Sequence, residues 1–352
     1  MERQRGLSVA QKKEQVDRFI SAKAFSKFKK VEKFSDHYRV TKELGSGAFG
    51  TVKLGQHRKS QVPCAIKIIK KSSLKVADVY LDLMKNELQV LENTIHPHIT
   101  RVFELMEDNR SYYIIMELIS GGNLLDIIYA EKKFSEHKAG KVMRQLLLAL
   151  NFMHKKNITH RDLKPENLLC EKTDDGSISV KLTDFGFACY YKSDAMMSLS
   201  LGSPLYMAPE LCAEDLYNEK VDVWACGVIT YILLTGQPPF VGGSKDEIYE
   251  NIQKMEPNYN QRQLRQCQAT ALDFIKKCLN KDPSLRPSVQ VALLGHGVEP
   301  LVLKELGDAW TEAWILVQTL FDEVKSGCLT LTKLPLIVVW LHFLNVLIDF
   351  VL

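Results

Sequence analysis

The pattern of hydrophobic and polar positions divides the chain into a strand-rich stretch and a helical stretch. Over residues 38–118, short apolar runs alternate with polar residues, which predicts strands at 38–44, 51–55, 64–69, 102–106 and 112–117. Residues 77–93 interrupt this alternation with helical spacing, shown by Val79, Leu83, Leu88 and Leu91. From residue 123 onward helices dominate, with an amphipathic helix expected over 138–154 and a strongly apolar one over 221–235.

Residues 1–37 have the pattern of a basic, partly helical extension. Val16, Phe19, Ile20, Phe28 and Val31 recur at roughly helical spacing, with Lys and Arg between them. Two interpretations stay open. The extension is either a strap that packs its apolar face on the following domain, or a basic amphipathic helix for an anionic membrane or a protein partner.

Residues 297–352 form a tail that ends in an apolar run, LPLIVVWLHFLNVLIDFVL. Three interpretations stay open: a regulatory helix packed on the helical stretch, part of a truncated or alternatively spliced product without a stable role, or a C-terminal membrane anchor. Asn345 and Asp349 count against membrane insertion. Residues 334–352 contain no Lys or Arg, whereas a calmodulin-target helix is basic as well as apolar.

Composition and charge narrow the class of protein. With 352 residues, 46% hydrophobic and 25% charged, the chain is no collagen, low-complexity polymer or disulfide-stapled miniprotein. The net charge of +4 hides a net +6 over residues 1–33, so the rest of the chain carries −2 and no nucleic-acid partner is expected. Eight scattered cysteines without C-x-x-C or zinc spacing, and no apolar leader, favour a cytoplasmic protein, with access to the nucleus left open.

A glycine-rich segment is the first candidate for chemistry. Its glycines would let a hairpin backbone close over phosphates and direct N–H groups at them. A strand follows it, which excludes a dinucleotide fingerprint, and the G-K-[ST] of a Walker A motif is missing. The segment consists of Leu44, Gly45, Ser46, Gly47, Ala48, Phe49, Gly50, Thr51 and Val52.

Lys67 is the second candidate, because it lies inside the apolar strand that contains Ala65 and Ile66. A lysine there is costly to bury unless it is paired. Glu87, on the helical stretch with Leu88 and Leu91, is the expected partner. The alternative is a surface lysine on a half-exposed strand.

Three further motifs follow in order: HRDLKPEN at 160–167, DFG at 184–186 and APE at 208–210. With the glycine-rich segment and Lys67, they make the sequence resemble a eukaryotic protein kinase over residues 38–296. The resemblance implies an α+β, bilobal protein kinase fold. Its N-lobe (38–118) would be an antiparallel β-sheet plus one helix, its C-lobe (119–296) mainly helical, and ATP would bind between them.

The resemblance also implies catalytic roles. Asp162 would accept and orient the substrate hydroxyl, and Lys164 would neutralise the transferring phosphoryl group, which favours Ser/Thr over Tyr substrates. Asn167 and Asp184 would hold Mg²⁺ through oxygen atoms. Lys67 would bind the ATP phosphates, and Glu87 would hold Lys67 in place. The loop formed by residues 44–50 would cover the phosphates.

The adenine base would lie in an apolar slot formed by Val52, Ala65 and Leu169. In the same resemblance, Met116 is the gatekeeper, and Glu117 and Leu118 supply hinge backbone groups. Three structural contacts are expected as well. Glu210 should pair with Arg286, Asp222 should accept hydrogen bonds from the catalytic-loop backbone, and the Ser203 hydroxyl should bridge Asp162 and Lys164.

Several segments, among them LLTGQPPF, resemble the calcium/calmodulin-dependent group, especially calcium-dependent protein kinases of protists and plants. Autophagy-initiating and other cytosolic Ser/Thr kinases are the alternative branch. Asn123 stands where relatives that prefer basic substrates usually carry an acid, whereas Glu166 is present, so only a weak basic preference is expected. Residues 322–333 outline an EF-hand, but Val324 and Lys333 occupy ligand positions, so Ca²⁺ binding is not expected.

Regulation is left with alternatives. Arg161 precedes Asp162, and in the family this arginine often binds a phosphate on the activation segment, defined here as residues 184–210. Ser198 and Ser200 are the candidate acceptors for an upstream kinase, and Asp194 could supply constant charge instead. Calmodulin dependence stays open. The rivals to an active kinase are an inert scaffold with the same fold and a binder of an anionic membrane or nucleic acid acting through residues 1–33.

Overall fold

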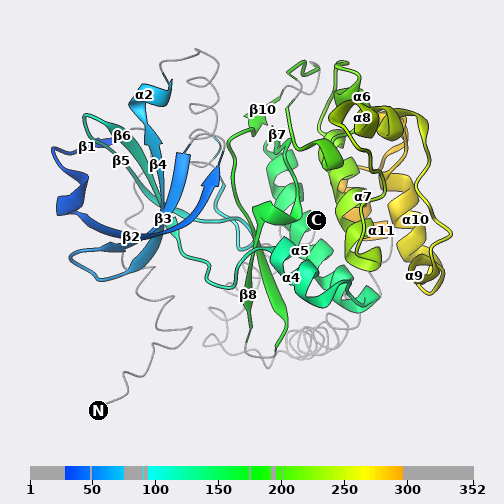
Figure 1. Ribbon diagram of the computed structural model, residues 1–352, viewed down its shortest axis with the longest axis horizontal. Coiled ribbons are helices and arrows are strands. Elements are labelled where there is room, and N and C mark those ends of the chain that lie inside the picture. The colour runs from blue at the N-terminus through cyan, green and yellow to red at the C-terminus, as the bar shows by residue number, and fades with distance from the viewer. Residues whose placement is uncertain are drawn as a thin grey trace, which may run out of the picture.

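The computed structural model describes residues 28–47, 50–74, 90, 94–173, 176–191, 196–199 and 201–295. Figure 1 shows two parts side by side, a sheet coloured mainly blue and cyan and a larger helical part coloured green to orange. The α+β bilobal architecture expected from the sequence is therefore confirmed. Among the described residues, no helix is both long and apolar enough to cross a membrane.

The strands of the described residues are as follows: β1 Lys29–Lys30, β2 Tyr38–Gly47, β3 Gly50–His57, β4 Pro63–Lys70, β5 Val102–Glu107, β6 Ser111–Glu117, β7 Ile158–Thr159, β8 Leu168–Lys172, β9 Ile178–Leu182 and β10 Cys189–Tyr190. The α-helices are α2 Lys71–Leu74, α4 Leu124–Glu131, α5 Glu136–Lys155, α6 Pro209–Cys212, α7 Lys220–Thr235, α8 Lys245–Lys254, α9 Arg262–Arg265, α10 Ala269–Cys278 and α11 Val289–Gly295. The five strands and two later helices expected from the pattern are all confirmed, and each is slightly longer than expected.

The N-lobe is a six-stranded sheet with the order β1-β5-β6-β4-β3-β2. Neighbours from β2 to β6 are antiparallel, whereas β1 is parallel to β5. β4 is central and is buried along most of its length, which fits its nearly continuous apolar sequence. This register places Val52 opposite Lys67, and Ala65 opposite Met116.

The expectation of helix around Phe28 and Val31 is wrong. Lys29 and Lys30 form β1 at the edge of the sheet, and the Val31 N–H donates to the Glu107 carbonyl at 2.9 Å. Phe28 contacts the Tyr112 ring with centroids 4.7 Å apart. The edge of β5 offers backbone hydrogen bonds and the Tyr112 ring offers apolar area, and a helix at this position would use neither.

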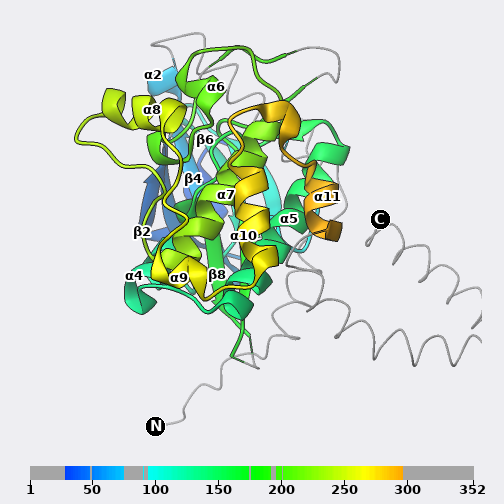
Figure 2. The same ribbon diagram turned by 90° about the vertical axis from the view of Figure 1, so that its right-hand side faces the viewer.

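The C-lobe is organised around α7, in which every residue from Val221 to Thr235 is buried. Figure 2 shows α7 behind α10, with α5 and α11 to one side. α7 contacts α10 and α5, and α11 contacts α5. α7 ends at Gly236, whose φ of +79° is left-handed. A Cβ there would lie 2.3 Å from the Lys132 carbonyl oxygen, so this helix end requires glycine.

Several expectations fall outside the described residues. These are the extension over 1–27, Ala48 and Phe49 of the glycine-rich segment, most of the helix expected over 77–93 with Glu87, Asp194, Ser200, and the tail over 297–352 with its apolar run and EF-hand outline.

Candidate active site

The catalytic loop, residues 160–167, is held by Asp222 at the start of α7. The carboxylate of Asp222 accepts hydrogen bonds from the backbone N–H groups of His160 and Arg161, both at 2.9 Å, as expected. It also accepts from Thr159 Oγ1 at 3.0 Å and bonds His154 Nε2 at 2.8 Å. Burial alone would raise the pKa of Asp222, but the hydrogen bond and charge of His154, with His160, lower it, so the carboxylate stays ionised.

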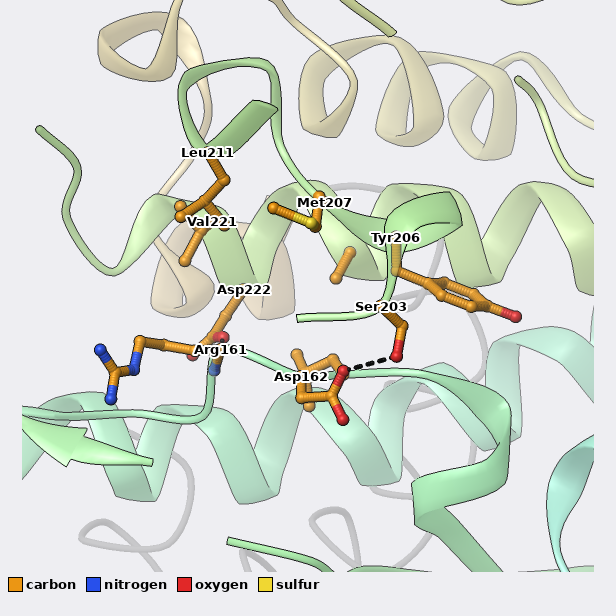
Figure 3. Close-up of a pocket in the computed structure, with 10 residues that line it drawn as sticks. Arg161, Asp162, Ser203, Tyr206, Met207, Leu211, Val221 and Asp222 are labelled. Carbon is orange, nitrogen blue, oxygen red and sulfur yellow. Dashed lines mark hydrogen bonds between the residues drawn. The ribbon is translucent and has the colours of Figure 1, made fainter. Parts of the chain in front are cut away.

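Asp162, Lys164 and Ser203 form a single cluster. Lys164 Nζ donates to Asp162 Oδ2 at 2.7 Å and to Ser203 Oγ at 2.8 Å. Ser203 Oγ donates to Asp162 Oδ1 at 2.8 Å, the contact drawn as a dashed line in Figure 3. The expected bridge by the Ser203 hydroxyl is therefore confirmed. The cluster places a carboxylate, an ammonium group and a hydroxyl of the activation segment at one point.

Asn167 is tied to the same cluster and has the donor atoms for a metal. Its side-chain nitrogen donates to the Asp162 carbonyl at 2.8 Å, which leaves the amide oxygen for another partner. Asn167 ends a 3₁₀ turn over Pro165–Asn167 and is buried. An amide oxygen and the Asp184 carboxylate are hard ligands of the kind that suit Mg²⁺ beside nucleotide phosphates.

Lys67 and Asp184 form an ion pair across the two lobes, with Nζ and Oδ1 3.1 Å apart. Lys67 is only 4% exposed, which excludes the alternative of a surface lysine. Burial by itself would raise the pKa of Asp184, but the charge and hydrogen bond of Lys67 outweigh it and lower that pKa. Asp184 has a φ of 60°, a left-handed conformation that is unfavourable for a residue other than glycine. In this conformation its carboxylate accepts the hydrogen bond from Lys67.

The described part of the glycine-rich segment lies at the end of β2 and the start of β3. Gly45 pairs with Val52, Ser46 with Thr51 and Gly47 with Gly50. A Cβ on Gly50 would lie 2.2 Å from the Ile68 carbonyl oxygen of β4, so this glycine is required by packing between strands. Leu44, next to Gly45, is 44% exposed, as befits a residue on the open side of a hairpin.

The hinge has a role that the sequence did not indicate. The Glu117 side chain accepts hydrogen bonds from Lys181 Nζ of β9 at 2.8 Å and from the Arg101 N–H at 2.7 Å. Its own N–H donates to the Arg101 carbonyl at 2.9 Å and so cannot serve a nucleotide. Leu118 follows β6 directly, and Leu169 lies on β8, in the separate sheet that β8 forms with β9.

Asn123 and Glu166, the two candidate residues for substrate recognition, differ in their hydrogen bonding. Asn123 caps α4, because its side-chain oxygen accepts from the Asp126 N–H at 3.0 Å. Glu166 Oε2 is a buried carboxylate oxygen without a hydrogen-bond partner among the described residues. Asn123 is thus committed to local structure, whereas Glu166 retains an acceptor for a basic group.

Two residues in this region were missed by the sequence reasoning, Lys181 and Tyr217. Lys181 lies 64 residues from its partner Glu117, and Tyr217 lies 56 residues from Arg161, whose guanidinium contacts the tyrosine hydroxyl. Neither belongs to a motif. Lys181 could have been noticed as a charged residue between the apolar residues of β9. No feature of the sequence pointed to the Tyr217 hydroxyl.

Comparison with known proteins identifies the domain to which this geometry belongs. Residues 38–296 match the protein kinase domain. Calcium-dependent protein kinase 4 of Plasmodium berghei is 35% identical over 272 residues, 77% of this chain and 51% of that protein. Myosin light chain kinase A of Dictyostelium discoideum is 38% identical over 256 residues, 73% of this chain and 86% of its own. The chain thus spans about half the length of the calcium-dependent relatives it matches.

Proposed function

The chain belongs to the protein kinase family, and from that premise we propose that it transfers the γ-phosphoryl group of ATP to Ser/Thr hydroxyls of protein substrates. The observation that carries this proposal is the cluster in which Asp162 bonds both Lys164 and Ser203, beside the Lys67–Asp184 pair. A bond would form from the hydroxyl oxygen to the γ-phosphorus as the bond to the β,γ-bridging oxygen breaks and ADP leaves, and the hydroxyl proton would pass to the Asp162 carboxylate.

Each residue has a separate task in this reaction. The Asp162 carboxylate accepts the hydrogen bond of the incoming hydroxyl and orients its oxygen. Lys164, already 2.7 Å from that carboxylate, neutralises charge on the transferred group. Lys67 contacts the phosphates from the N-lobe side. Mg²⁺, held by Asn167 and Asp184 together with the phosphates, would supply further charge neutralisation.

The test is phosphoryl transfer to a Ser/Thr peptide array with Mg·ATP. We expect Asp162→Asn to reduce turnover by about a thousandfold or more, because the orienting carboxylate is lost. Asp246→Asn is the matched control, since Asp246 is exposed in the first turn of α8. Nucleotide binding without transfer to any Ser or Thr would favour an inert scaffold, and undiminished turnover in Asp162→Asn would exclude this catalytic role.

The same array tests two finer points of substrate and activation. The unpartnered oxygen of Glu166 supports a weak preference for basic residues in the substrate. The names of the Plasmodium relatives include calcium dependence. The EF-hand outline of this chain has a lysine and a valine at ligand positions. We therefore propose activity without added Ca²⁺ or calmodulin, and strict dependence on either would contradict this.

We further propose that an upstream kinase acts on the activation segment. Ser198 is exposed and precedes Leu199 in the part of the segment that contacts the C-lobe. A phosphate there would add negative charge near Arg161. Treatment with phosphatase should lower turnover of the cell-derived protein, and Ser198→Ala should remove that sensitivity. If Ser198→Ala leaves the response to phosphatase unchanged, Ser198 is not the acceptor.

A cytoplasmic location is proposed as well, supported by the free state of the described cysteines. Fractionation of cells expressing the tagged full chain checks it. Recovery in the membrane fraction would favour the alternatives in which the basic extension or the apolar tail contacts a membrane.

A further inference from the structure

Tyr217 lies between α6 and α7, and its side chain is almost fully buried, at 1% exposure. Its hydroxyl accepts a hydrogen bond from Arg161 Nη1 at 3.0 Å and donates to the Leu199 carbonyl at 2.7 Å. One hydroxyl thus joins the catalytic loop to the activation segment. A buried hydroxyl that is both donor and acceptor is fully used by these two contacts.

The backbone of Tyr217 holds the same part of the activation segment. The Met197 N–H donates to the Tyr217 carbonyl at 2.8 Å, and the Tyr217 N–H donates to the Met197 carbonyl at 2.9 Å. On the other side, Cys189 of β10 contacts Met197 through the two sulfur atoms at 3.5 Å. Tyr217 therefore holds residues 197–199 at both ends, through its backbone at Met197 and through its hydroxyl at Leu199.

Arg161 transmits this arrangement to the catalytic carboxylate. Figure 3 shows that the side chains of Arg161 and Asp162, adjacent in sequence, point in opposite directions. Arg161 has a φ of 67°, a left-handed conformation that needs support from its surroundings. That support comes from Asp222 on its backbone, from the Phe187 carbonyl at 2.6 Å from Nε, and from the Tyr217 hydroxyl.

The Arg161 guanidinium is bonded only by neutral oxygens within the part of the chain that the structure describes, namely Phe187 O and Tyr217 Oη. The residue is 8% exposed. Loss of a partner around a buried cation is costly, because the charge cannot recover its hydration. The Tyr217 hydroxyl is therefore one of few groups that hold this side chain in its direction.

We propose that Tyr217 is a positioning residue for phosphoryl transfer, coupling Arg161 and the adjacent Asp162 to the activation segment at Leu199. This inference rests on the proposed kinase function. Leu199 is four residues before Ser203, whose hydroxyl bonds Asp162. Fixing Leu199 limits the positions open to Ser203, and fixing Arg161 limits those open to Asp162.

The test is Tyr217→Phe in the full chain, which keeps the buried ring and removes the hydroxyl. We expect kcat/KM for the peptide to fall about fivefold to twentyfold, from loss of two hydrogen bonds of which one involves a charge. The KM for ATP should stay unchanged, because the Tyr217 hydroxyl bonds Arg161 and Leu199, whereas Lys67 and Asp184 bond each other. A general loss of structure would instead change both substrates' constants together.

Tyr231→Phe is the matched control. Tyr231 is also 1% exposed, and its hydroxyl likewise donates to a carbonyl, that of Asn258 at 3.0 Å, and accepts from Gln261 at 2.9 Å. It lies on α7 on the side away from the catalytic loop contacts. We expect Tyr231→Phe to lower the free energy of unfolding about as much as Tyr217→Phe does. Its kcat/KM for the peptide should equal that of the unchanged protein.

A second readout does not depend on turnover. Met196 and Leu199 are about half exposed, and Tyr217 bonds the backbone of Met197 and the Leu199 carbonyl. Limited digestion with chymotrypsin should cut Tyr217→Phe at these residues faster than Tyr231→Phe. Arg161→Lys, which keeps the charge but lacks Nη1, should reproduce the kinetic pattern, and the double variant with Tyr217→Phe should show little further loss.

The outcomes separate this inference from the kinase proposal. If the unchanged chain phosphorylates peptides and Tyr217→Phe matches Tyr231→Phe in peptide kinetics and digestion, the coupling role is wrong while the kinase function stands. A loss that affects ATP and peptide alike also overturns it. Repeating the comparison in Ser198→Ala protein should give the same ratio, and disappearance of the effect there would make Tyr217 a part of phosphate binding instead.

Discussion

Arg286 and Glu210 form a two-pronged ion pair in the C-lobe, with Nη1 2.6 Å from Oε1 and Nη2 2.7 Å from Oε2. Arg286 is 1% exposed and also donates to backbone carbonyls, including that of Asn280 at 2.8 Å. The pair joins the end of the activation segment to the segment that follows α10. The contact expected from the sequence is confirmed, and its geometry makes it a structural support of the site.

Removing one partner of this pair should be strongly destabilising. Glu210→Gln would leave the Arg286 charge buried without its counter-ion, so we expect the free energy of unfolding to fall by about 3–5 kcal/mol. Urea denaturation followed by tryptophan fluorescence measures this. Glu250→Gln is the control, because its pair with Lys254 is exposed at 60% and 70% and should contribute too little to detect. Similar small effects in both variants would contradict the assignment.

Gly50 should tolerate substitution less well than Gly45, although both belong to the glycine-rich segment. An alanine Cβ at Gly50 would meet the Ile68 carbonyl at 2.2 Å, whereas nothing lies within 4 Å of a Cβ at Gly45. We expect Gly50→Ala to lower the free energy of unfolding by about 1–3 kcal/mol through separation of β3 from β4. Gly45→Ala should keep the unfolding midpoint. Equal midpoints for the two variants would show that β3 can shift without cost.

The hydroxyl of Ser203, and not its size, should matter for turnover. Ser203→Ala removes the donor to Asp162 and the acceptor from Lys164, and we expect kcat to fall by about tenfold to a hundredfold. Ser203→Thr restores a hydroxyl and should recover most of the rate. Steady-state kinetics with a peptide substrate distinguishes them. An alanine variant with unchanged kcat would mean that Lys164 orients Asp162 unaided.

Buried histidines should make the fold less stable in mild acid. Burial, together with the charges of His98 and Lys181, lowers the pKa of His96 to about 4. Burial also lowers the pKa of His160 despite the nearby acids. Because the unfolded chain then binds protons at higher pH than the folded chain, stability present above about pH 6.5 is lost as the pH falls.

The measurement is the free energy of unfolding at several pH values between about 7.5 and 5. His96 Nδ1 accepts a hydrogen bond from the His98 N–H at 3.1 Å, which a protonated nitrogen cannot do. His96→Gln offers an acceptor without a titration in this range, so its curve should be flatter. An unchanged slope in that variant would place the pH dependence elsewhere, with His160 as the next candidate.

The residues of the catalytic loop could be predicted because short motifs carry most of the chemistry. Asp162, Lys164 and Asn167 lie within six residues, and their mutual contacts follow from one tight turn. Lys67 was recognisable as a charge inside an apolar strand, where burial requires a partner. That this partner includes Asp184, 117 residues away, depends on how the two lobes meet.

β1 shows where periodicity failed. The helical spacing of Phe28 and Val31 described the apolar positions but not the surface available to them. The free edge of β5 and the rings of Tyr112 and Tyr113 lie where this segment passes, and Phe34 stacks on Tyr113 with centroids 3.7 Å apart. Two residues of strand satisfy that edge, and intrinsic helical preference is too small to compete with it.

The sequence by itself determined the kinase fold, the strand and helix pattern and the main chemical groups, because these depend on local spacing and on short motifs. Only the tertiary structure decided that Glu117 binds Lys181 and that Tyr217 connects Arg161 to Leu199. Each joins side chains from segments far apart in the chain. A hydroxyl or carboxylate acquires its partner only when packing brings that partner within hydrogen-bonding distance, and no local pattern records it.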